Sequence, residues 1–89
     1  MRNIIETKQF QRDYKKVIAS GRCKKDDFLS VIKMLATDEV LPLKHADHSL
    51  IGKWQGFRDC HIKPDWVLIY KKQNNDLFLA RTGTHSELF

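Results

Sequence analysis

The chain has 89 residues and a mass of 10.5 kDa, so we expect one domain over residues 1–89 and no room for a separate cofactor domain. Its 42% hydrophobic and 30% charged residues indicate a globular protein and exclude a disordered chain. No apolar run approaches the ~18 residues of a membrane span, and no secretory signal follows Met1. We therefore expect a cytoplasmic protein without membrane contact, in which Cys23 and Cys60 stay reduced.

Positive charge is concentrated in the first half of the chain. The net charge is +5. Residues 1–44 hold 10 basic and 6 acidic residues, whereas residues 45–89 hold 6 and 5. The basic cluster consists of Lys15, Lys16, Arg22, Lys24 and Lys25. Such a cluster fits a polyanionic partner, either a nucleic acid or an acidic protein, although solvated lysines without a partner remain the alternative.

The first half reads as a strand followed by two helices. Residues 2–6 predict a short strand, and Thr7 can cap a helix that ends at Ser20-Gly21. A second helix is predicted over residues 26–36, and the short turn between the two predicts an antiparallel helical hairpin. Residues 37–49, with Pro42, predict a loop. The apolar stripes are Phe10, Tyr14, Val17 and Ile18 in the first helix, and Phe28, Val31, Ile32 and Leu35 in the second.

The second half reads as an antiparallel meander of three strands over residues 56–62, 66–70 and 77–83, joined by turns. Alternation along the first of them places Phe57, Asp59 and His61 on one face, and Arg58, Cys60 and Ile62 on the other. Trp66 to Tyr70 is apolar throughout, as in a central strand covered on both faces. With the helices on one face of the sheet, the fold class is α+β in two layers.

All four histidines lie in the second half, with aspartates close by in sequence. The set is His45, His48, His61, His85, Asp47, Asp59 and Asp65. Arg81 and His85 are an even number of positions apart at the end of the last strand, so we expect both side chains on the same face of the sheet. Because one imidazole can take a proton while another donates one, these residues suit RNA cleavage, in which Arg81 would stabilise the phosphorane charge.

Two other interpretations stay open at this point. The histidines can be surface residues without a role. Alternatively, His45 and His48, at i, i+3 spacing, can bind zinc or another transition metal together with His61 and Asp65.

Three stretches of the second half carry a family resemblance. They are His48-Ser49-Leu50-Ile51-Gly52, then residues 54–70 (Trp-Gln-Gly-Phe-Arg-Asp-Cys-His-Ile-Lys-Pro-Asp-Trp-Val-Leu-Ile-Tyr), then residues 81–89 (Arg-Thr-Gly-Thr-His-Ser-Glu-Leu-Phe). Together they resemble the YafQ group of RelE-type bacterial toxins, with a specific match from residue 47 to the C-terminus. The first half agrees mainly in its layout. The group often has Pro where this chain has Ser49, so the loop that carries His48 is expected to be looser.

The resemblance implies a fold, an activity and partners. The fold is a microbial-ribonuclease-like α+β domain with about four antiparallel strands. The activity is that of an mRNA interferase, an endoribonuclease that cuts mRNA in the ribosomal A site without a metal or other cofactor. The partners are a cognate antitoxin, the ribosome and mRNA, and promoter DNA for the toxin–antitoxin complex only. A non-catalytic nucleic-acid-binding component of a repressor complex, or a ribonuclease that acts on free RNA, remain the alternatives.

The resemblance also implies roles for individual residues. His85 is the general acid, and His48, His61 and Asp65 share the base and orienting roles. Asp59, Arg81 and Phe89 match family positions near the site, Arg81 for phosphate charge and Phe89 for the base or the cleft wall. Four lysines fit contact with ribosomal RNA or with an acidic antitoxin segment: Lys15, Lys16, Lys24 and Lys25.

Overall fold

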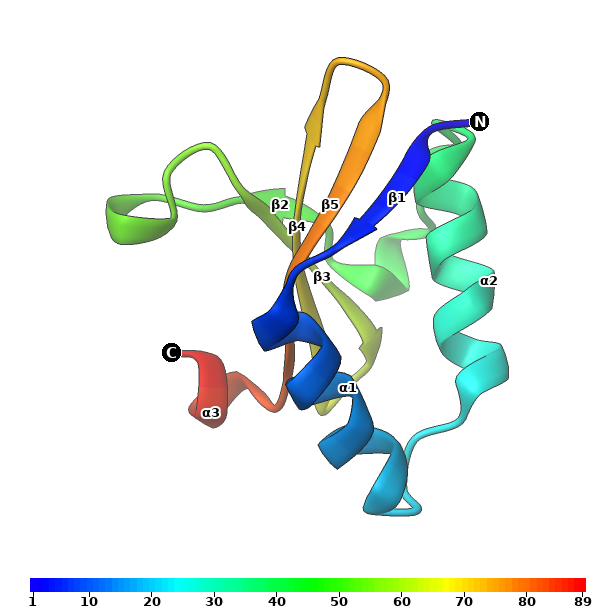
Figure 1. Cartoon of the computed structure of the whole chain (residues 1–89), viewed down its shortest axis with the longest axis vertical. Helices are drawn as coiled ribbons and strands as arrows, with labels where there is room; N and C mark the ends of the chain where they lie inside the picture. The colour runs from blue at the N-terminus through cyan, green and yellow to red at the C-terminus, as the bar shows by residue number, and fades with distance from the viewer.

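A twisted five-stranded sheet forms the centre of the α+β fold, as a computed structural model of all 89 residues shows (Figure 1). The elements in chain order are β1 (Asn3–Glu6), α1 (Lys8–Ala19), α2 (Lys25–Ala36), the 3₁₀ turn η1 (Leu43–His45), β2 (His48–Ser49), the 3₁₀ turn η2 (Gly52–Trp54), β3 (Arg58–Lys63), β4 (Trp66–Gln73), β5 (Asp76–Gly83) and α3 (His85–Leu88). The α+β class and most of the predicted elements are therefore confirmed.

The sheet has the strand order β1-β5-β4-β3-β2. The predicted meander is confirmed, since β3, β4 and β5 pair antiparallel through short turns. The sheet differs from the expected one of about four antiparallel strands in having a fifth strand and one parallel pair. The predicted loop over residues 37–49 contains the two-residue strand β2, and β1 pairs parallel to β5. No tight turn sets the direction of β1, because both helices and the rest of the sheet separate it from its partner in sequence.

The helical hairpin forms where the caps and apolar stripes predict it. Thr7 Oγ1 accepts a hydrogen bond from the backbone N–H of Phe10 at 3.0 Å and so caps α1. α2 begins one residue earlier than predicted, at Lys25, and has Asp26 and Asp27 in its first turn, where the helix dipole favours acids. The two helices run in opposite directions (Figure 1) and pack on the same face of the sheet.

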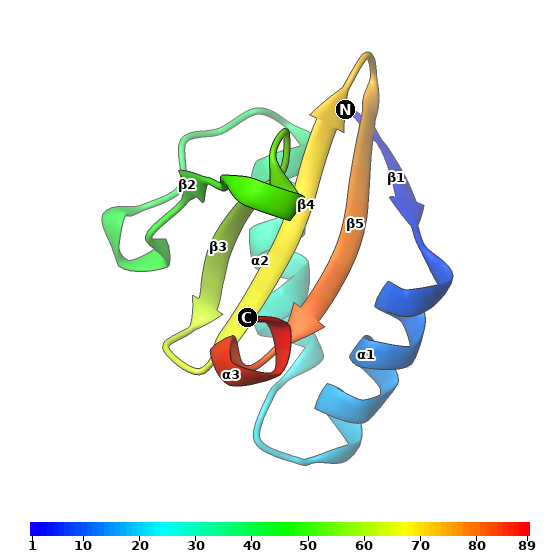
Figure 2. The same cartoon turned by 90° about the vertical axis from the view of Figure 1, so that its left-hand side faces the viewer.

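The two sheet faces are covered unequally. The main core holds 14 buried residues, among them Phe10, Phe28 and Trp66, and joins both helices to one face. On the other face Val67 and Ile69 pack against Leu88 of α3 and against partly buried side chains near η2. Figure 2 shows α3 and η2 on this face, opposite α2. The strand β4 is buried because both faces of the sheet are covered, as its apolar sequence predicts. The elements on the second face are additional to the two layers that were predicted.

The short helix α3 is absent from the predicted elements. It begins because the Thr84 hydroxyl accepts from the Glu87 N–H at 3.2 Å while Glu87 Oε1 accepts from the Thr84 N–H at 2.9 Å. The strand β5 therefore ends at Gly83, where a Cβ atom would lie 3.1 Å from Glu87 Oε1. The predicted placement of Arg81 and His85 on the same face of the sheet is wrong, because His85 belongs to this helix. No helix of the protein combines the length and apolar character needed to cross a membrane.

Candidate active site

Three of the four histidines lie around the buried carboxylate of Asp59. On β3, Asp59 and His61 share the face opposite the helical hairpin, as predicted, and the pairing of β2 with β3 brings His48 opposite Asp59. His85 enters from α3. Burial raises the pKa of Asp59, which is 4% exposed, above its usual value. The positive charges of the imidazoles of His48, His61 and His85 oppose this rise, which places all three within electrostatic reach of the carboxylate.

The imidazole of His48 has one committed nitrogen and one free nitrogen. Its Nδ1 lies 2.8 Å from the Ala46 carbonyl oxygen and 3.0 Å from Asp59 Oδ1. Because a carbonyl oxygen can only accept, Nδ1 carries the proton. Its hydrogen points at Ala46, and Asp59 Oδ1 receives no well-aligned hydrogen bond, so the contact with Asp59 is electrostatic. Nε2 of this exposed side chain is left with its lone pair.

In His61 and His45, too, Nδ1 is bound to a backbone carbonyl oxygen, but His45 is buried away from the site. His61 Nδ1 donates to the Pro64 carbonyl oxygen at 3.2 Å, so its Nε2 is also free to accept a proton. His45 is buried, and its Nδ1 donates at 2.6 Å to the backbone carbonyl of His61. It thereby fastens η1 to β3 and has a structural role. No group of three or more His, Cys, Asp or Glu side chains is placed to hold a metal ion, so the predicted set that included His45 and Asp65 is not brought together.

A small hydrogen-bond network holds the segment that carries His48. Asp47 Oδ1 accepts from the Tyr70 hydroxyl at 2.6 Å and from Arg58 Nε at 3.2 Å. Burial, followed by the adjacent Asp47 carboxylate, raises the pKa of Tyr70, which keeps its hydroxyl protonated as a donor. Ser49 pairs with Arg58 in the sheet. The segment is therefore anchored on both sides of His48, which counters the loosening expected from Ser49.

The first turn of α3 presents His85 and the C-terminal Phe89 together. Both side chains are exposed, and their ring centroids lie 4.9 Å apart at an interplanar angle of 40°. Leu88, which is 5% exposed, anchors the turn in the second core. Phe89 therefore lies against His85, and its role at the base or the cleft wall stays a prediction.

Arg81 is held by α1 and is not free in the site. Its Nε and Nη2 donate to the two carboxylate oxygens of Asp13 at 2.9 and 3.0 Å. The same carboxylate accepts from Gln9 Nε2 at 3.0 Å and from the Thr82 N–H at 3.3 Å. The sheet register shifts between Ile69 and its neighbour opposite this part of β5. Only Nη1 of Arg81 remains without a protein partner for the predicted phosphate contact.

Sequence reasoning missed Asp13, although a signal was present. Asp13 follows Phe10 by three positions and precedes Val17 by four, so a charged residue interrupts the apolar stripe of α1. Such a residue is buried only with a partner. The partner, Arg81, is 68 positions away in sequence.

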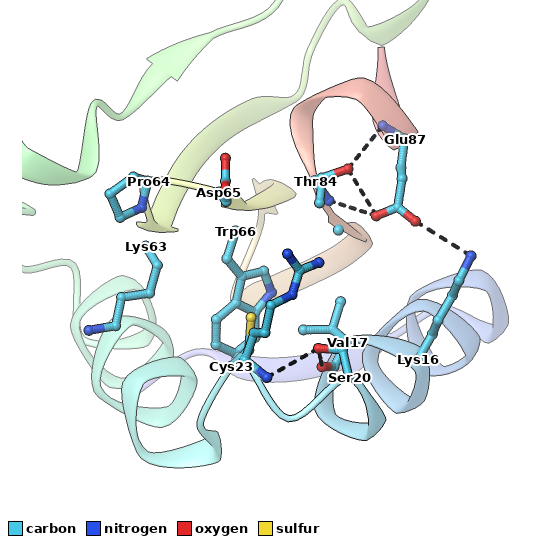
Figure 3. Close-up of a pocket in the computed structure, with 12 residues that line it drawn as sticks. Lys16, Val17, Ser20, Cys23, Lys63, Pro64, Asp65, Trp66, Thr84 and Glu87 are labelled. Carbon is cyan, nitrogen blue, oxygen red and sulfur yellow. Dashed lines mark hydrogen bonds and ion pairs between the residues drawn. The ribbon is translucent and has the colours of Figure 1, made fainter.

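Asp65 and the lysines lie outside the histidine cluster. Asp65 is exposed in the β3–β4 turn, at the rim of a neighbouring cleft (Figure 3). Lys16 lines the same cleft and lies 3.4 Å from Glu87 of α3. The other predicted cations are exposed along α1 and at the start of α2: Lys15, Lys24 and Lys25.

Comparison with known proteins places this geometry in a family. Residues 2–89 match the family model described as bacterial toxin of type II toxin–antitoxin system, YafQ. The mRNA interferase toxin YafQ of Escherichia coli K12 is 41% identical over 90 residues, which cover 99% of this chain and 96% of that protein. A copper-bound mutant toxin from Helicobacter pylori is similar in structure, with a TM-score of 0.95 and 42% identity over 100% of both chains. The E. coli DinJ-YafQ toxin–antitoxin complex matches with a TM-score of 0.85 and 36% identity, over 99% of this chain and 97% of that one.

Proposed function

The chain belongs to the YafQ family of bacterial type II toxin–antitoxin toxins, whose curated relatives are named mRNA interferases, and we propose that it is an endoribonuclease that cleaves mRNA by acid–base transesterification without a metal ion. The observation that carries the proposal is the set of three histidines at Asp59: His48 lies 3.0 Å from its carboxylate, His61 shares its strand face, and His85 enters from α3. In the reaction the ribose 2′-oxygen attacks the adjacent phosphorus, and the bond from phosphorus to the 5′-oxygen breaks. The products are a 2′,3′-cyclic phosphate and a free 5′-hydroxyl.

His48 is the general base of this proposal. Its Nε2 is free, because Nδ1 donates to Ala46. When Nε2 takes the 2′-hydroxyl proton, the ring becomes an imidazolium, and the carboxylate of Asp59 at 3.0 Å from Nδ1 stabilises the new charge. Asp59 thereby acts as a positioning residue. His61, on the same strand face, has the free Nε2 needed to orient the hydroxyl or the phosphate.

His85 is the general acid. As an imidazolium it gives its proton to the departing 5′-oxygen. The base thereby gains one proton from the 2′-hydroxyl, and the acid loses one to the leaving group. The capped turn of α3 and the ring of Phe89 restrict its orientation. Phosphorane charge is met by the free Nη1 of Arg81 and by the imidazolium groups. Asp65, at the edge of the β3–β4 turn, borders the substrate path.

The proposed partners follow from the family and from the basic surface. A relative was crystallised as the DinJ-YafQ toxin–antitoxin complex, and we assign this chain a cognate antitoxin, with which it would bind promoter DNA. The exposed cations Lys15, Lys24 and Lys25, on α1 and around the start of α2, suit ribosomal RNA, since phosphate neutralisation needs charge and no sequence reading. The toxin would then act in the cytosol, in the ribosomal A site, where the ribosome holds the mRNA.

Expression of the wild-type chain against His85→Ala tests the proposal. The wild type should arrest growth and leave new 5′ ends on translated messages, and the alanine variant should do neither while remaining folded. Equal toxicity and equal cleavage by His85→Ala would show that the general acid is assigned wrongly. If the wild type makes no cut in any reading frame, the chain is a non-catalytic binding module. Equal cleavage of free and ribosome-bound RNA would show a ribonuclease that needs no ribosome.

A further inference from the structure

A cleft with a volume of about 480 Å³ lies beside the histidine cluster and has no role in the proposed proton transfers. Its walls are the C-terminal end of α1 with the turn after it, the β3–β4 turn, and the start of α3 (Figure 3). These three segments are far apart in sequence and meet only in the fold. Pockets of about 300–1,000 Å³ hold small ligands, so this one has room for a single nucleotide.

The lining of the cleft combines cations with an apolar floor. Lys16, Arg22 and Lys63 line it, and its apolar floor consists of the half-buried Val17 and Cys23 together with Trp66, of which only 1% is exposed. Lys63 lies 3.5 Å from a carboxylate of α2, and Arg22 takes part in none of the seven ion pairs of the structure. Arg22 is also exposed. An unpaired guanidinium beside apolar side chains suits a ligand that has both a phosphate and a flat ring.

The acids at the rim leave the cleft open to a phosphate. Glu87 is engaged by Lys16 at 3.4 Å across the gap between α1 and α3, as Figure 3 shows. Both side chains are exposed, by 79% and 43%, so this ion pair contributes little and Lys16 can exchange the carboxylate for a phosphate. The side chain of Asp65 points away from Trp66 in Figure 3.

The cleft adjoins the proposed chemistry through two of its lining residues. Thr84 directly precedes His85 and caps α3. The carbonyl oxygen of Pro64 accepts the hydrogen bond that orients His61. The cleft lining is therefore directly connected to two of the three histidines, His85 through the chain and His61 through a hydrogen bond.

We propose that this cleft binds one nucleotide of the mRNA strand next to the scissile phosphate, with its backbone phosphate on Arg22 and its base on the apolar floor. The inference rests on the proposed function and adds a substrate subsite to it. Such a subsite would let the toxin distinguish bases that flank the cut. It also gives part of the basic cluster a role in holding substrate.

The test compares Arg22→Gln with Arg12→Gln, a matched change of the same net charge at an exposed position outside the cleft. The probe is a short RNA with 2′-O-methyl riboses, which the toxin cannot cleave. Arg22→Gln should weaken binding roughly tenfold, the value of one charge-assisted hydrogen bond. It should also reduce the salt slope of the binding constant by about 0.7, the loss of one single-strand phosphate contact. Arg12→Gln should leave the slope unchanged. NMR titration of the wild type should shift the amides of Cys23 and Thr84.

Cleavage on mRNA-programmed ribosomes is the second measurement. Arg22→Gln should raise KM with little change in kcat, because the subsite binds substrate and moves no proton. If the two arginine variants share one KM and one salt slope while the wild type cleaves, the subsite is wrong and the proposed function stands. If the wild type does not cleave but the binding difference appears, the proposed function is wrong and the nucleotide site stands. A defect confined to binding of ribosomes without mRNA would assign the cleft to ribosomal RNA and overturn the inference.

Discussion

Replacing Asp13 by asparagine removes the negative charge from the contact that ties α1 to β5. The carboxylate is 9% exposed and accepts four hydrogen bonds, two of them from Arg81. Asparagine keeps one acceptor oxygen and puts an NH₂ group against donors of Arg81 or Thr82. One strong bidentate contact is thereby replaced by a repulsive one.

The magnitude follows from the burial of the two partners. Breaking a fully buried ion pair costs about 3–5 kcal/mol. The Arg81 side chain is 31% exposed and can recover water, which reduces the expected loss to about 2 kcal/mol. For a domain of this length, that loss lowers Tm by about 10 °C.

The loss depends on pH with a definite sign. Burial alone would raise the pKa of Asp13, but the hydrogen bonds from Arg81, Gln9 and Thr82 outweigh it, and the pKa lies below the usual 3.8. A lowered pKa contributes stability that is fully present above the unfolded value and is lost as pH falls through the folded value. The difference between wild type and Asp13→Asn should therefore be largest at neutral pH and shrink in acid.

Urea unfolding followed by circular dichroism, at neutral and at acid pH, measures this difference. Asp76→Asn, at a partly exposed aspartate of β5 that takes part in no ion pair, is the control and should cost little. A double-mutant cycle with Arg81→Gln should give a coupling of about 1–2 kcal/mol. A coupling near zero, or an equal loss of stability in acid, would refute the ion-pair reasoning.

Three further predictions concern the proposed reaction. His85→Ala should lower the cleavage rate by about 10²–10⁴-fold, the contribution of a general acid, with an unchanged urea midpoint because the side chain is exposed. Asp59→Asn should lower cleavage by at least about tenfold while the protein stays as stable as wild type or becomes more stable at neutral pH. Since burial raises the pKa of Asp59, its ionised form costs stability, and the gain should vanish as pH falls below the unfolded value of 3.8; a destabilised variant at neutral pH would contradict this. Cleavage should persist in excess chelator, and its loss with recovery on adding copper would favour a metal-dependent reaction, since relatives from Helicobacter pylori were crystallised as copper-bound and metal-bound toxins.

Local sequence patterns determined most of the secondary structure. The apolar stripe from Phe10 to Ile18 and the Thr7 cap set α1, because both act within a few residues. Alternation along β3 placed Asp59 and His61 on one face for the same reason. The pattern Thr84-x-x-Glu87 is equally local and marks the start of α3. The prediction that one strand continues from Arg81 to His85 did not take this pattern into account.

Tertiary structure alone decided how the site is assembled. Segments that are distant in sequence meet in the parallel pairing of β1 with β5 and in the ion pair of Asp13 with Arg81, and β2 pairs with β3 across the loop that contains η2. The periodicity of the sequence does not predict such pairings. The sequence identified the histidines as candidates for proton transfer, and their catalytic roles stay predictions. Their arrangement around one buried carboxylate, and the separation of Asp65 and His45 from it, depend on how the sheet closes against η1, β2 and α3. Contacts of this kind are set by packing of the whole chain. Burial of the Asp59 carboxylate away from water strengthens its electrostatic interaction with the nearby imidazoles, and that burial exists only in the folded protein.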